Sequence, residues 1–246
     1  MLKYPTGPFI AAQFLFLMSK KFMKSLFNLR LTSSIIVCII SFQACSDAPK
    51  GDNATIMEKQ QASEAKGSLF VVDTAASKIR FVGHGVGKNH PGIFKLSTGT
   101  VAISANDITG GDFVIDITSM DLEQKGGMFD KKLHPHLMSG DFFDADKFRS
   151  ATFEITKVEP YQPSSNISIV HGANFIISGN FTLKNVTKNI SFPAKVDLDA
   201  NTLKAKGNFD IDRTQWNMNY GNDKTLGDKF ISEKVNIELD LHAKKQ

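Results

Sequence analysis

The sequence predicts an all-β domain, an antiparallel barrel or sandwich of about eight or nine short strands. In most segments after Leu69, apolar and polar residues alternate with period two, as in "ISFPAKVDL" at 190–198. The alternating runs are short and end at Gly, Asn and Asp, the residues of tight turns. Of the 246 residues, 41% are hydrophobic and 20 are phenylalanine, which is enough for a substantial core.

Residues 1–45 have the features of a targeting segment. Lys24 and Arg30 form a charged region, and the apolar stretch 33–42 that follows is too short to span a bilayer comfortably. The translation start is expected at one of two methionines, Met18 or Met23.

The end of this segment, Phe42-Gln43-Ala44-Cys45, resembles a bacterial lipobox, in which the cysteine receives a lipid and becomes the new N-terminus. We therefore expect lipidation at Cys45, a membrane anchor at the N-terminus, and an exported protein in the periplasm or tethered to the outer membrane. Residues 46–68 are polar and poor in aromatic residues, which predicts a flexible tether. An ordinary signal peptide cut nearby, or an uncleaved anchor, is the alternative.

The net charge of +4 is concentrated at the N-terminus. Residues 1–45 carry five basic residues and no acidic one, which leaves 24 basic against 25 acidic residues in the rest of the chain. A nearly neutral body has no electrostatic footprint for nucleic acid, so that class of partner is excluded. The two cysteines, Cys38 and Cys45, both precede the domain, which therefore has no disulfide and no thiol chemistry.

The domain is expected to span 69–246. Its first three strands are marked by the apolar sets Ile79 and Phe81, then Val101 and Ile103, then Phe113, Ile115 and Ile117. A turn at 106–111 joins the second and third of these strands. Further strands are predicted at 152–158, 174–183, 190–198, 203–211 and 234–242, the last with Val235, Ile237, Leu239 and Leu241 on one face. The segment 126–151 does not alternate, and it is predicted to carry a short helix and a loop.

The apolar faces are expected to point inward. Eight strands enclose an interior that is either filled by side chains or wide enough for one small ligand, and the alternation leaves both open. Asn180 and Asn189 lie in Asn-x-Ser/Thr sequences and are interpreted as residues of exposed strand faces. Seven phenylalanines are inward by parity and are the best candidates for lining a pocket: Phe81, Phe113, Phe153, Phe175, Phe181, Phe192 and Phe209.

Four segments carry a family resemblance: "SKIRFVGHGVGKNHPGIF" (77–94), "HLMSGDFFDADKFRSATFEITKV" (136–158), "FTLKNVTKNISFP" (181–193) and "GNFDIDRTQWNMNYG" (207–221). Together they resemble the YceI-like family of exported bacterial proteins, lipocalin-like barrels associated with polyisoprenoid binding. The resemblance implies an eight-stranded antiparallel lipocalin-like barrel with a short helix-containing loop. It also implies a non-catalytic function, the binding of a long isoprenoid lipid or isoprenoid quinone inside the barrel.

Two positions depart from the family pattern. Asn185 stands where a glycine is usual, and because Asn tolerates positive φ the turn should be retained. Trp216-Asn217 replaces Phe-Gly, which is expected to narrow or reshape one end of the barrel.

Arg213 and Trp216 complete the candidate ligand-binding set. Arg213 falls out of the apolar alternation, and a lone arginine at a barrel mouth could meet a lipid head group, a phosphate or a quinone oxygen. The alternative is a structural ion pair with a nearby aspartate, the usual state of a half-buried arginine. The candidate partners are Asp210, Asp212 and Asp228.

Two other functions stay open. Four loop histidines could converge on a metal ion, although their spacing alone is weak evidence: His84, His90, His134 and His136. Alternatively, a filled barrel could act as a surface interaction partner, for instance as a homodimer. The acidic "DFFDAD" segment lacks the glycine and glutamate of a calcium loop, and no glycine-rich phosphate loop or G-x-S-x-G motif occurs, so no enzymatic activity is expected.

Overall fold

The computed structural model describes residues 50–163 and 167–246. Ser46–Gln246 forms a compact unit of its own. The predicted start codons, the targeting segment and Cys45 lie outside the described residues. Within the described ranges, no helix is long and apolar enough to cross a membrane.

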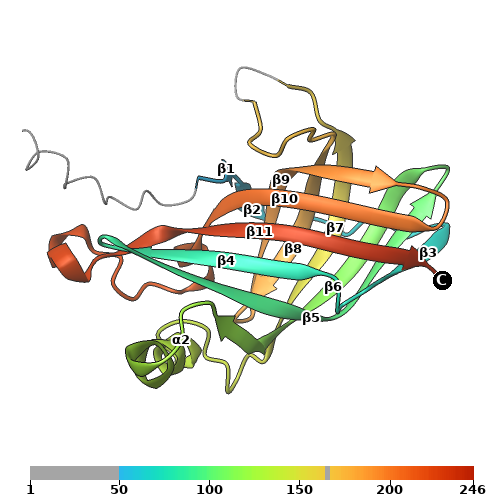
Figure 1. The fold of residues 1–246 in the computed structure, drawn as a ribbon. Coiled ribbons are helices and arrows are strands. Elements are labelled where there is room, and N and C mark those ends of the chain that lie inside the picture. The colour runs from blue at the N-terminus through green and yellow to red at the C-terminus, as the bar shows by residue number, and fades with distance from the viewer. Residues whose placement is uncertain (1–49, 164–166) are drawn as a thin grey trace, which may run out of the picture. The chain divides into compact units, whose positions relative to one another are not determined.

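The domain is a closed, eight-stranded antiparallel barrel, which confirms the predicted fold class (Figure 1). Its wall consists of β4 (Lys78–Gly85), β5 (Lys88–Ser104), β6 (Asp107–Leu122), β7 (Ser150–Pro160), β8 (Phe175–Leu183), β9 (Val186–Leu198), β10 (Thr202–Asp212) and β11 (Ile231–Lys245). Each strand pairs with the next, and the ring closes where β11 pairs with β4. Because side chains alternate across each strand, one set of residues is committed to the interior.

The turns show where local sequence sets the backbone. Lys184 and Asn185 join β8 to β9 with φ of 48° and 61°, so Asn185 adopts the left-handed conformation as expected. The turn predicted at 106–111 is shorter. Only Ala105 and Asn106 have positive φ, 51° and 69°, which is the two-residue turn that matches the twist of a hairpin. The glycines that suggested a longer turn, Gly110 and Gly111, lie inside β6.

One end of the barrel carries all the helical turns. The segment 126–151 contains η1 (Phe129–Leu133) and α2 (His134–Met138), which confirms its predicted short helix. Between β10 and β11 lie η2 (Arg213–Trp216) and η3 (Lys224–Lys229), two 3-10 turns that the alternation did not predict. We call this the helical end. It comprises the turn at 86–87, residues 126–143 and residues 213–231.

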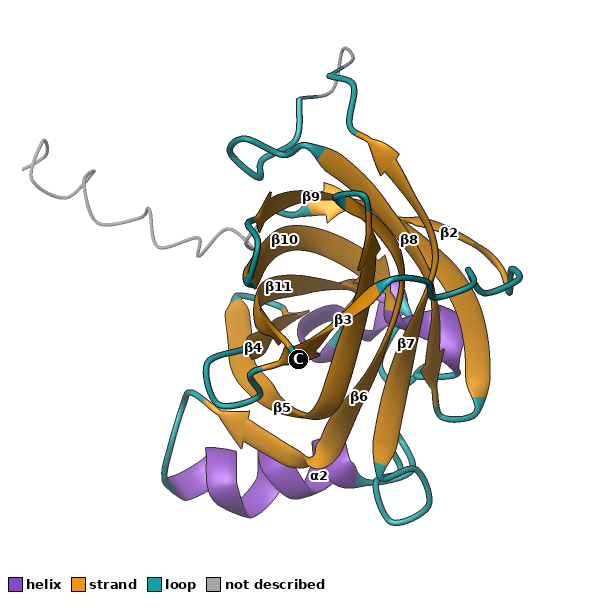
Figure 2. Cartoon of the chain, turned by 90° about the vertical axis from the view of Figure 1, so that its right-hand side faces the viewer, coloured by secondary structure: helices purple, strands orange, loops and turns teal. Residues whose placement is uncertain are grey.

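The opposite, closed end is filled by side chains. The short strand β3 (Ser68–Val72) pairs with both β5 and β11 beside β4, and in Figure 2 it crosses the ring of strands at this end. The residues buried here come from β3, β5, β10 and β11: Phe70, Val72, Val101, Leu203 and Ala243. Each buried aliphatic or aromatic side chain stabilises the fold by about 1.5–3 kcal/mol, so this plug is a major part of the core.

Residues 50–66, expected to form part of a flexible tether, instead lie along the outside of the barrel. We call them the N-terminal strap. The ladder between β9 and β10 extends only as far as the pair Ala194 and Gly207. Beyond it, β1 (Asp52–Asn53) pairs with β10 and β2 (Thr55–Glu58) pairs with β9. The strap therefore supplies partners to two strand edges that would otherwise have unpaired backbone groups.

Buried amides on the barrel's outer face hold the strap. Asn180 accepts a hydrogen bond from the N–H of Gln60 at 3.0 Å and donates to the Gln60 carbonyl at 2.8 Å. Ser63 bonds to the carbonyl of Ile155 through its N–H at 3.1 Å and its hydroxyl at 2.9 Å. Asn180 and Asn189 are 2% and 1% exposed, so the expectation that they lie on exposed strand faces is wrong, because the strap covers them. Polar side chains can be buried on the outer face only where they have hydrogen-bond partners, which the strap supplies here.

We predict that Asn180→Ala lowers the free energy of unfolding by about 1–3 kcal/mol, because it leaves both polar groups of Gln60 and one amide bond of Asn189 without their partner. The measurement is urea unfolding of the unit Ser46–Gln246. Asn201→Ala is the matched control, since Asn201 is an exposed turn residue, and it should change stability by less than about 0.5 kcal/mol. Equal losses in the two variants would contradict the role given to the strap.

The turn aspartates predict a dependence on pH. Hydrogen bonds from the N–H of Ala76, Asn201 and Thr225 are the main cause of the lowered pKa of Asp73, Asp199 and Asp223 respectively. A lowered pKa in the folded state means that these carboxylates stabilise the protein above their ordinary pKa of 3.8, and that this stabilisation is lost as the pH falls through the folded-state pKa. Asp199→Asn, which removes one such charge, should therefore show a shallower acid limb when unfolding is measured below pH 4. An acid limb as steep as that of the unchanged protein would contradict this.

Candidate functional site

The barrel interior contains a cavity of about 320 Å³. Its size falls within the range of pockets that hold small ligands, roughly 300–1,000 Å³. The cavity lies between the plug of the closed end and the helical end, with Val101 and Leu203 of the plug in its wall. The interior is thus not completely filled, which decides between the two states that the alternation left open and removes the filled-barrel alternative.

The inward residues of β11 also indicate that the barrel interior is not completely filled. Val235, Ile237, Leu239 and Leu241 were predicted to share one face, and all four line the cavity. They are nevertheless only half-buried, although each points to the inside of a closed barrel. Apolar side chains on an inner face stay half-exposed only where no other side chain packs against them.

Aromatic rings dominate the wall. Of the seven predicted phenylalanines, six line the cavity: Phe81, Phe113, Phe153, Phe181, Phe192 and Phe209. Phe192 and Phe209 stack at 3.9 Å between ring centroids, and Phe153 lies 6.1 Å from both Phe113 and Phe192. The Phe192 and Phe209 rings are nearly parallel, at 15°, whereas Phe153 is tilted by 46° to Phe192 and by 49° to Phe113, so the rings form a continuous but bent aromatic wall across β6, β7, β9 and β10. Their contact with a ligand stays a prediction.

A glycine makes room for one of these rings. An added Cβ at Gly179 of β8 would lie 2.2 Å from Cζ of Phe153, a distance that no real contact adopts. The tip of the Phe153 ring therefore occupies the space beside the backbone of Gly179, and any larger residue at 179 would displace the ring. The volume of the cavity depends on this small residue as much as on the large ones.

Two of the predicted lining residues do not line the cavity. Phe175 has the same parity as Phe181 but lies at the start of β8, where it packs on the outer margin of the core. Trp216 is completely buried in η2 rather than in a strand. Its ring meets Phe181 edge-on at 5.3 Å and its Nε1 donates to the Phe181 carbonyl at 3.2 Å. Trp216 thus supports the wall from behind, and Asn217 with φ of 58° keeps the turn that glycine would make.

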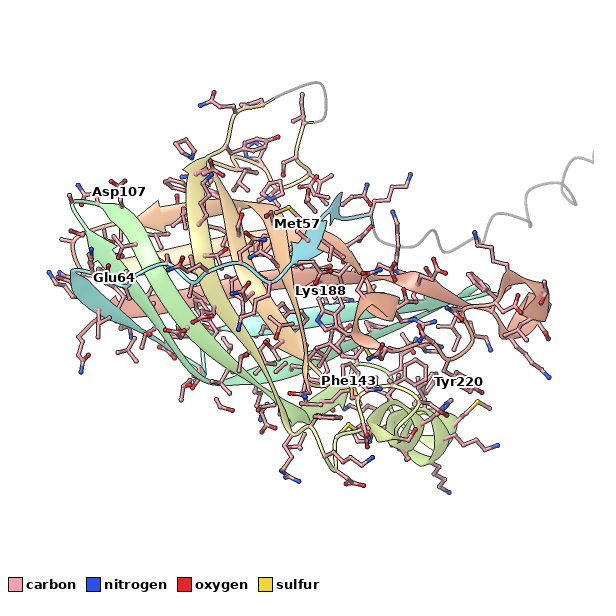
Figure 3. All side chains as sticks on the ribbon, turned by 180° about the vertical axis from the view of Figure 1, so that it is seen from behind. Met57, Glu64, Asp107, Phe143, Lys188 and Tyr220 are labelled. Carbon is pink, nitrogen blue, oxygen red and sulfur yellow. The ribbon has the colours of Figure 1, made fainter. Side chains whose placement is uncertain are left out.

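Other lining residues escaped prediction. Phe94 and Leu96 alternate within β5 and could have been found by parity. Phe142 and Phe143 come from the loop after α2, in the "DFFDAD" segment that drew attention only for its carboxylates. Phe143 meets Phe94 edge-on at 5.3 Å, and Figure 3 shows it beside the helical segment, at the same end as Tyr220. Because this loop does not alternate between apolar and polar residues, its sequence does not predict which side chains face the interior. Only the tertiary structure places Phe142 and Phe143 here.

Arg213 is buried where η2 begins and also lines the cavity. Its Nε donates to the carbonyl of Ser232 at 2.8 Å, its Nη2 donates to Tyr220 and Ile231 at 2.9 Å each, and its Nη1 donates to Met218. In the described residues it has no carboxylate partner within ion-pair distance, so the expected pairing with Asp210, Asp212 or Asp228 is wrong. Backbone carbonyls satisfy the guanidinium instead, because the 218–232 segment folds around it.

The electrostatic state of Arg213 follows from this burial. Removal from water lowers the pKa of its guanidinium from the ordinary value, while the nearby charges of Asp212 and Glu233 act in the opposite direction. The group stays protonated at neutral pH, since a free arginine titrates above 12. Four of its five N–H groups bond to carbonyls, which leaves one donor on Nη1 at the edge of an otherwise apolar cavity.

The four candidate metal-binding histidines reach the helical end but bind other groups. His84 bonds to Asn89 at 2.9 Å and His90 to Gln124 at 3.1 Å. The imidazole of His134 meets the Met120 carbonyl at 3.2 Å, and that of His136 meets Asp141 at 2.9 Å. Within residues 50–163 and 167–246, no group of three or more His, Cys, Asp or Glu side chains could hold a metal ion. The metal hypothesis therefore gains no geometric support from these histidines.

Comparison with known proteins gives a consistent result. The sequence profile of the YceI-like domain matches residues 70–243. A UPF0312 protein of Shewanella sp. strain MR-7 is 26% identical over 152 residues, covering 56% of this chain and 73% of the relative.

Two solved structures share the fold. BcnA of Burkholderia cenocepacia superposes with a TM-score of 0.55 at 23% identity, over 70% of this chain and 98% of BcnA. A polyisoprenoid-binding domain of Saccharophagus degradans gives a TM-score of 0.52 at 16% identity, over 72% of this chain and 98% of that domain.

We predict that Arg213→Lys destabilises the protein by about 2–4 kcal/mol, because one ammonium cannot replace a guanidinium fork that reaches four carbonyls, and each bond to a charged group is worth about 1.5–3 kcal/mol. Thermal and urea unfolding measure the loss. The matched control is Arg80→Lys on the outer surface, where Arg80 pairs with Glu123 and Glu238. That half-exposed pair should lose at most about 1 kcal/mol. Similar losses at the two sites would show that Arg213 does not hold the helical end together.

Proposed function

The chain belongs to the YceI-like family, and on this basis we propose that it is a non-catalytic binding protein for a long apolar lipid of the isoprenoid class, held inside the barrel. The observation that carries the proposal is the open, aromatic-lined cavity of about 320 Å³ in a closed barrel. The structural relative from Saccharophagus degradans, described as a polyisoprenoid-binding domain, supports the same ligand class.

The wall suits an isoprenoid chain for a physical reason. Such a chain is flat at each double bond and carries regularly spaced methyl branches, which can pack against the stacked rings of Phe192 and Phe209 and the tilted ring of Phe153. Moving the chain out of water is favourable by about 0.8 kcal/mol per buried methylene. In a bilayer the chain is already out of water, so the barrel gains little by extracting it. The protein is therefore better suited to shielding a lipid in transit than to storing it.

The position of Arg213 suggests how a ligand would be oriented in the cavity. The remaining Nη1 donor is a polar group at the helical end of the cavity, whereas the closed end is lined by Val101 and Leu203. At the helical end, a quinone oxygen or a phosphate oxygen would find this donor beside the polar side chains of His84, His136 and Ser232, which also line the cavity. We infer that the tail points toward the closed end and the head group toward Arg213.

The proposed location is the periplasmic face of a membrane, through an anchor at Cys45. Gly51 is only six positions after Cys45, and its N–H bonds to the Asp210 carboxylate at 3.2 Å. Six extended residues span at most about 20 Å. Because the strap is bound to the barrel, such an anchor would hold the cavity close to the bilayer rather than at the end of a long tether.

The test is organic extraction and mass spectrometry of the unit Ser46–Gln246, expressed in a bacterial periplasm and purified without detergent. We expect an isoprenoid quinone or polyprenol near one molecule per barrel. Ala205→Phe should lower the recovery about tenfold, because the added ring enters the cavity and crowding of this kind costs about 1–3 kcal/mol.

Lys204→Phe is the matched control, since it adds the same ring one residue away on the outer face of β10 and should leave recovery unchanged. Recovery of no lipid, together with no uptake of added isoprenoids by the purified unit, would overturn the proposal. Equal recovery from Ala205→Phe and from the unchanged protein would place the lipid outside the cavity.

A further inference from the structure

We propose that the helical end of the barrel is a docking surface for a bilayer that contains anionic lipids. The proposal goes beyond the binding of a lipid inside the barrel. It rests on that proposed function only for the reason why the protein would dock on a membrane. It is carried by the position of the cavity, by exposed apolar residues on several separate segments and by lysines without ion-pair partners.

The segments of the helical end meet in space. His136 of α2 lies edge-on to Tyr220 at 4.6 Å between ring centroids, and Phe129 of η1 lies 6.2 Å from His90 of β5. The start of β11 pairs with Gly85, next to the turn between β4 and β5. Figure 3 shows Tyr220 at the opposite end of the barrel from Asp107, which marks a turn of the closed end.

The cavity reaches this end. Its wall there includes His84, Gly85, His136, Ile231 and Ser232, all of them half-exposed. At the other end the cavity meets the buried plug. A lipid that leaves or enters along the barrel axis therefore passes the helical end.

Four large apolar or aromatic side chains project from this end into solvent. Val86 is 54% exposed at the tip of the β4–β5 turn, and Met128 is 67% exposed just before η1. Tyr220 and Leu226 are 48% and 43% exposed between β10 and β11. In the structure described, the closed-end turns at 73–77, 105–106 and 199–201 carry no exposed large apolar residue, whereas the longer connection between β7 and β8 exposes Ile167 and Ile169, at 78% and 50%.

Lysines surround these four residues. In the described part of the chain, five exposed lysines of the helical end form no ion pair: Lys88, Lys131, Lys132, Lys224 and Lys229. Four aspartates lie in the same segments: Asp130 bonds to the N–H of Gly126, Asp141 to His136 and Asp223 to Thr225, while Asp228 is exposed. The balance is positive on a domain that is otherwise nearly neutral.

This combination fits a membrane surface better than a protein partner. The apolar residues sit singly on protruding turns, separated by lysines, instead of forming one flat patch. Single apolar side chains can enter the acyl boundary of a bilayer while lysines beside them contact anionic head groups. Docking at the cavity opening would also let a lipid move from bilayer to barrel without exposing its chain to water, where each methylene costs about 0.8 kcal/mol.

The test is flotation of the unit Ser46–Gln246 with vesicles of phosphatidylcholine alone and with vesicles of phosphatidylcholine and phosphatidylglycerol at three to one. The unit has its own core and closes its hydrogen bonds within itself, so it is expected to fold alone. We expect partitioning to the phosphatidylglycerol vesicles that weakens as salt is raised. Lys131→Gln with Lys132→Gln should weaken it roughly tenfold, given the contribution of each basic residue near an anionic surface.

The apolar contribution is tested by Met128→Asp with Leu226→Asp, which should likewise abolish most of the binding. The matched control is Leu69→Asp with Val71→Asp on the outer face of β3, where both residues are similarly exposed, at 43% and 44%. The control should bind vesicles as the unchanged unit does. None of these residues lines the cavity, so all variants should retain lipid extracted from the purified protein, which separates failure of docking from failure of lipid binding.

The proposal is overturned if the unchanged unit floats with neither kind of vesicle, or if the β3 control loses binding to the same extent. It is also overturned if the unit is a dimer in solution that Met128→Asp with Leu226→Asp dissociates while neither form binds vesicles. That result would assign the helical end to a second copy of the chain.

Discussion

The closure of the barrel at the pairing of β11 with β4 is the constraint on which the rest of the structure depends. Once eight strands form a ring, the interior volume is fixed by geometry, and the inward side chains either fill it or leave it empty. At the closed end, Phe70 and Val72 of the additional strand β3 fill the ring. Further along, no such strand exists, and the rings of Phe153 and Phe192 lie along the wall, where Gly179 leaves room for the tip of the Phe153 ring. The cavity therefore depends both on where the additional strand supplies residues and on the small residue at 179.

Two sets of polar interactions hold the ring of strands in one arrangement. At the helical end, Arg213 binds carbonyls from the 218–220 segment and from the start of β11, so one buried charge holds the 218–232 segment in place. Such a charge is tolerated because every bond it makes is to an oriented dipole, and its loss would leave several buried carbonyls unpaired. Along the seam between β9 and β10, the N-terminal strap does the equivalent work with backbone pairing and the buried amide of Asn180. The strap acts on the outer face of the barrel, and Arg213 acts at one end of the cavity, so most of the cavity wall remains apolar.

These features assign different tasks to the two ends of the molecule. The closed end supplies stability through packing, and its turns at 73–77, 105–106 and 199–201 are short, whereas the β7–β8 connection on this side is long and exposes Ile167 and Ile169. The helical end contains two of the longer connections, most of the polar lining of the cavity, and exposed apolar residues with lysines beside them. For the proposed carrier of a lipid that is already shielded in a bilayer, the difficult step is the transfer rather than the binding. A cavity that reaches the same end as the proposed docking surface would reduce that cost.

The sequence by itself determined which side of each strand faces inward, because period-two alternation is a local property: the set Val235 to Leu241 and the left-handed Asn185 both appear as predicted. The family resemblance supplied the strand number and the closed barrel. Alternation does not predict where along the barrel axis a residue lies. Phe175 and Phe181 are therefore on the same face of β8, although only Phe181 lines the cavity. Charge and proximity along the chain suggested carboxylate partners for Arg213, yet its partners are carbonyls up to 19 residues away. The polar composition of the strap indicated flexibility, whereas its partners are distant along the chain, 92 residues for Ser63 with Ile155 and 120 residues for Gln60 with Asn180. Tertiary structure alone decided these points, since each depends on contacts between segments that the chain brings together only when the barrel closes.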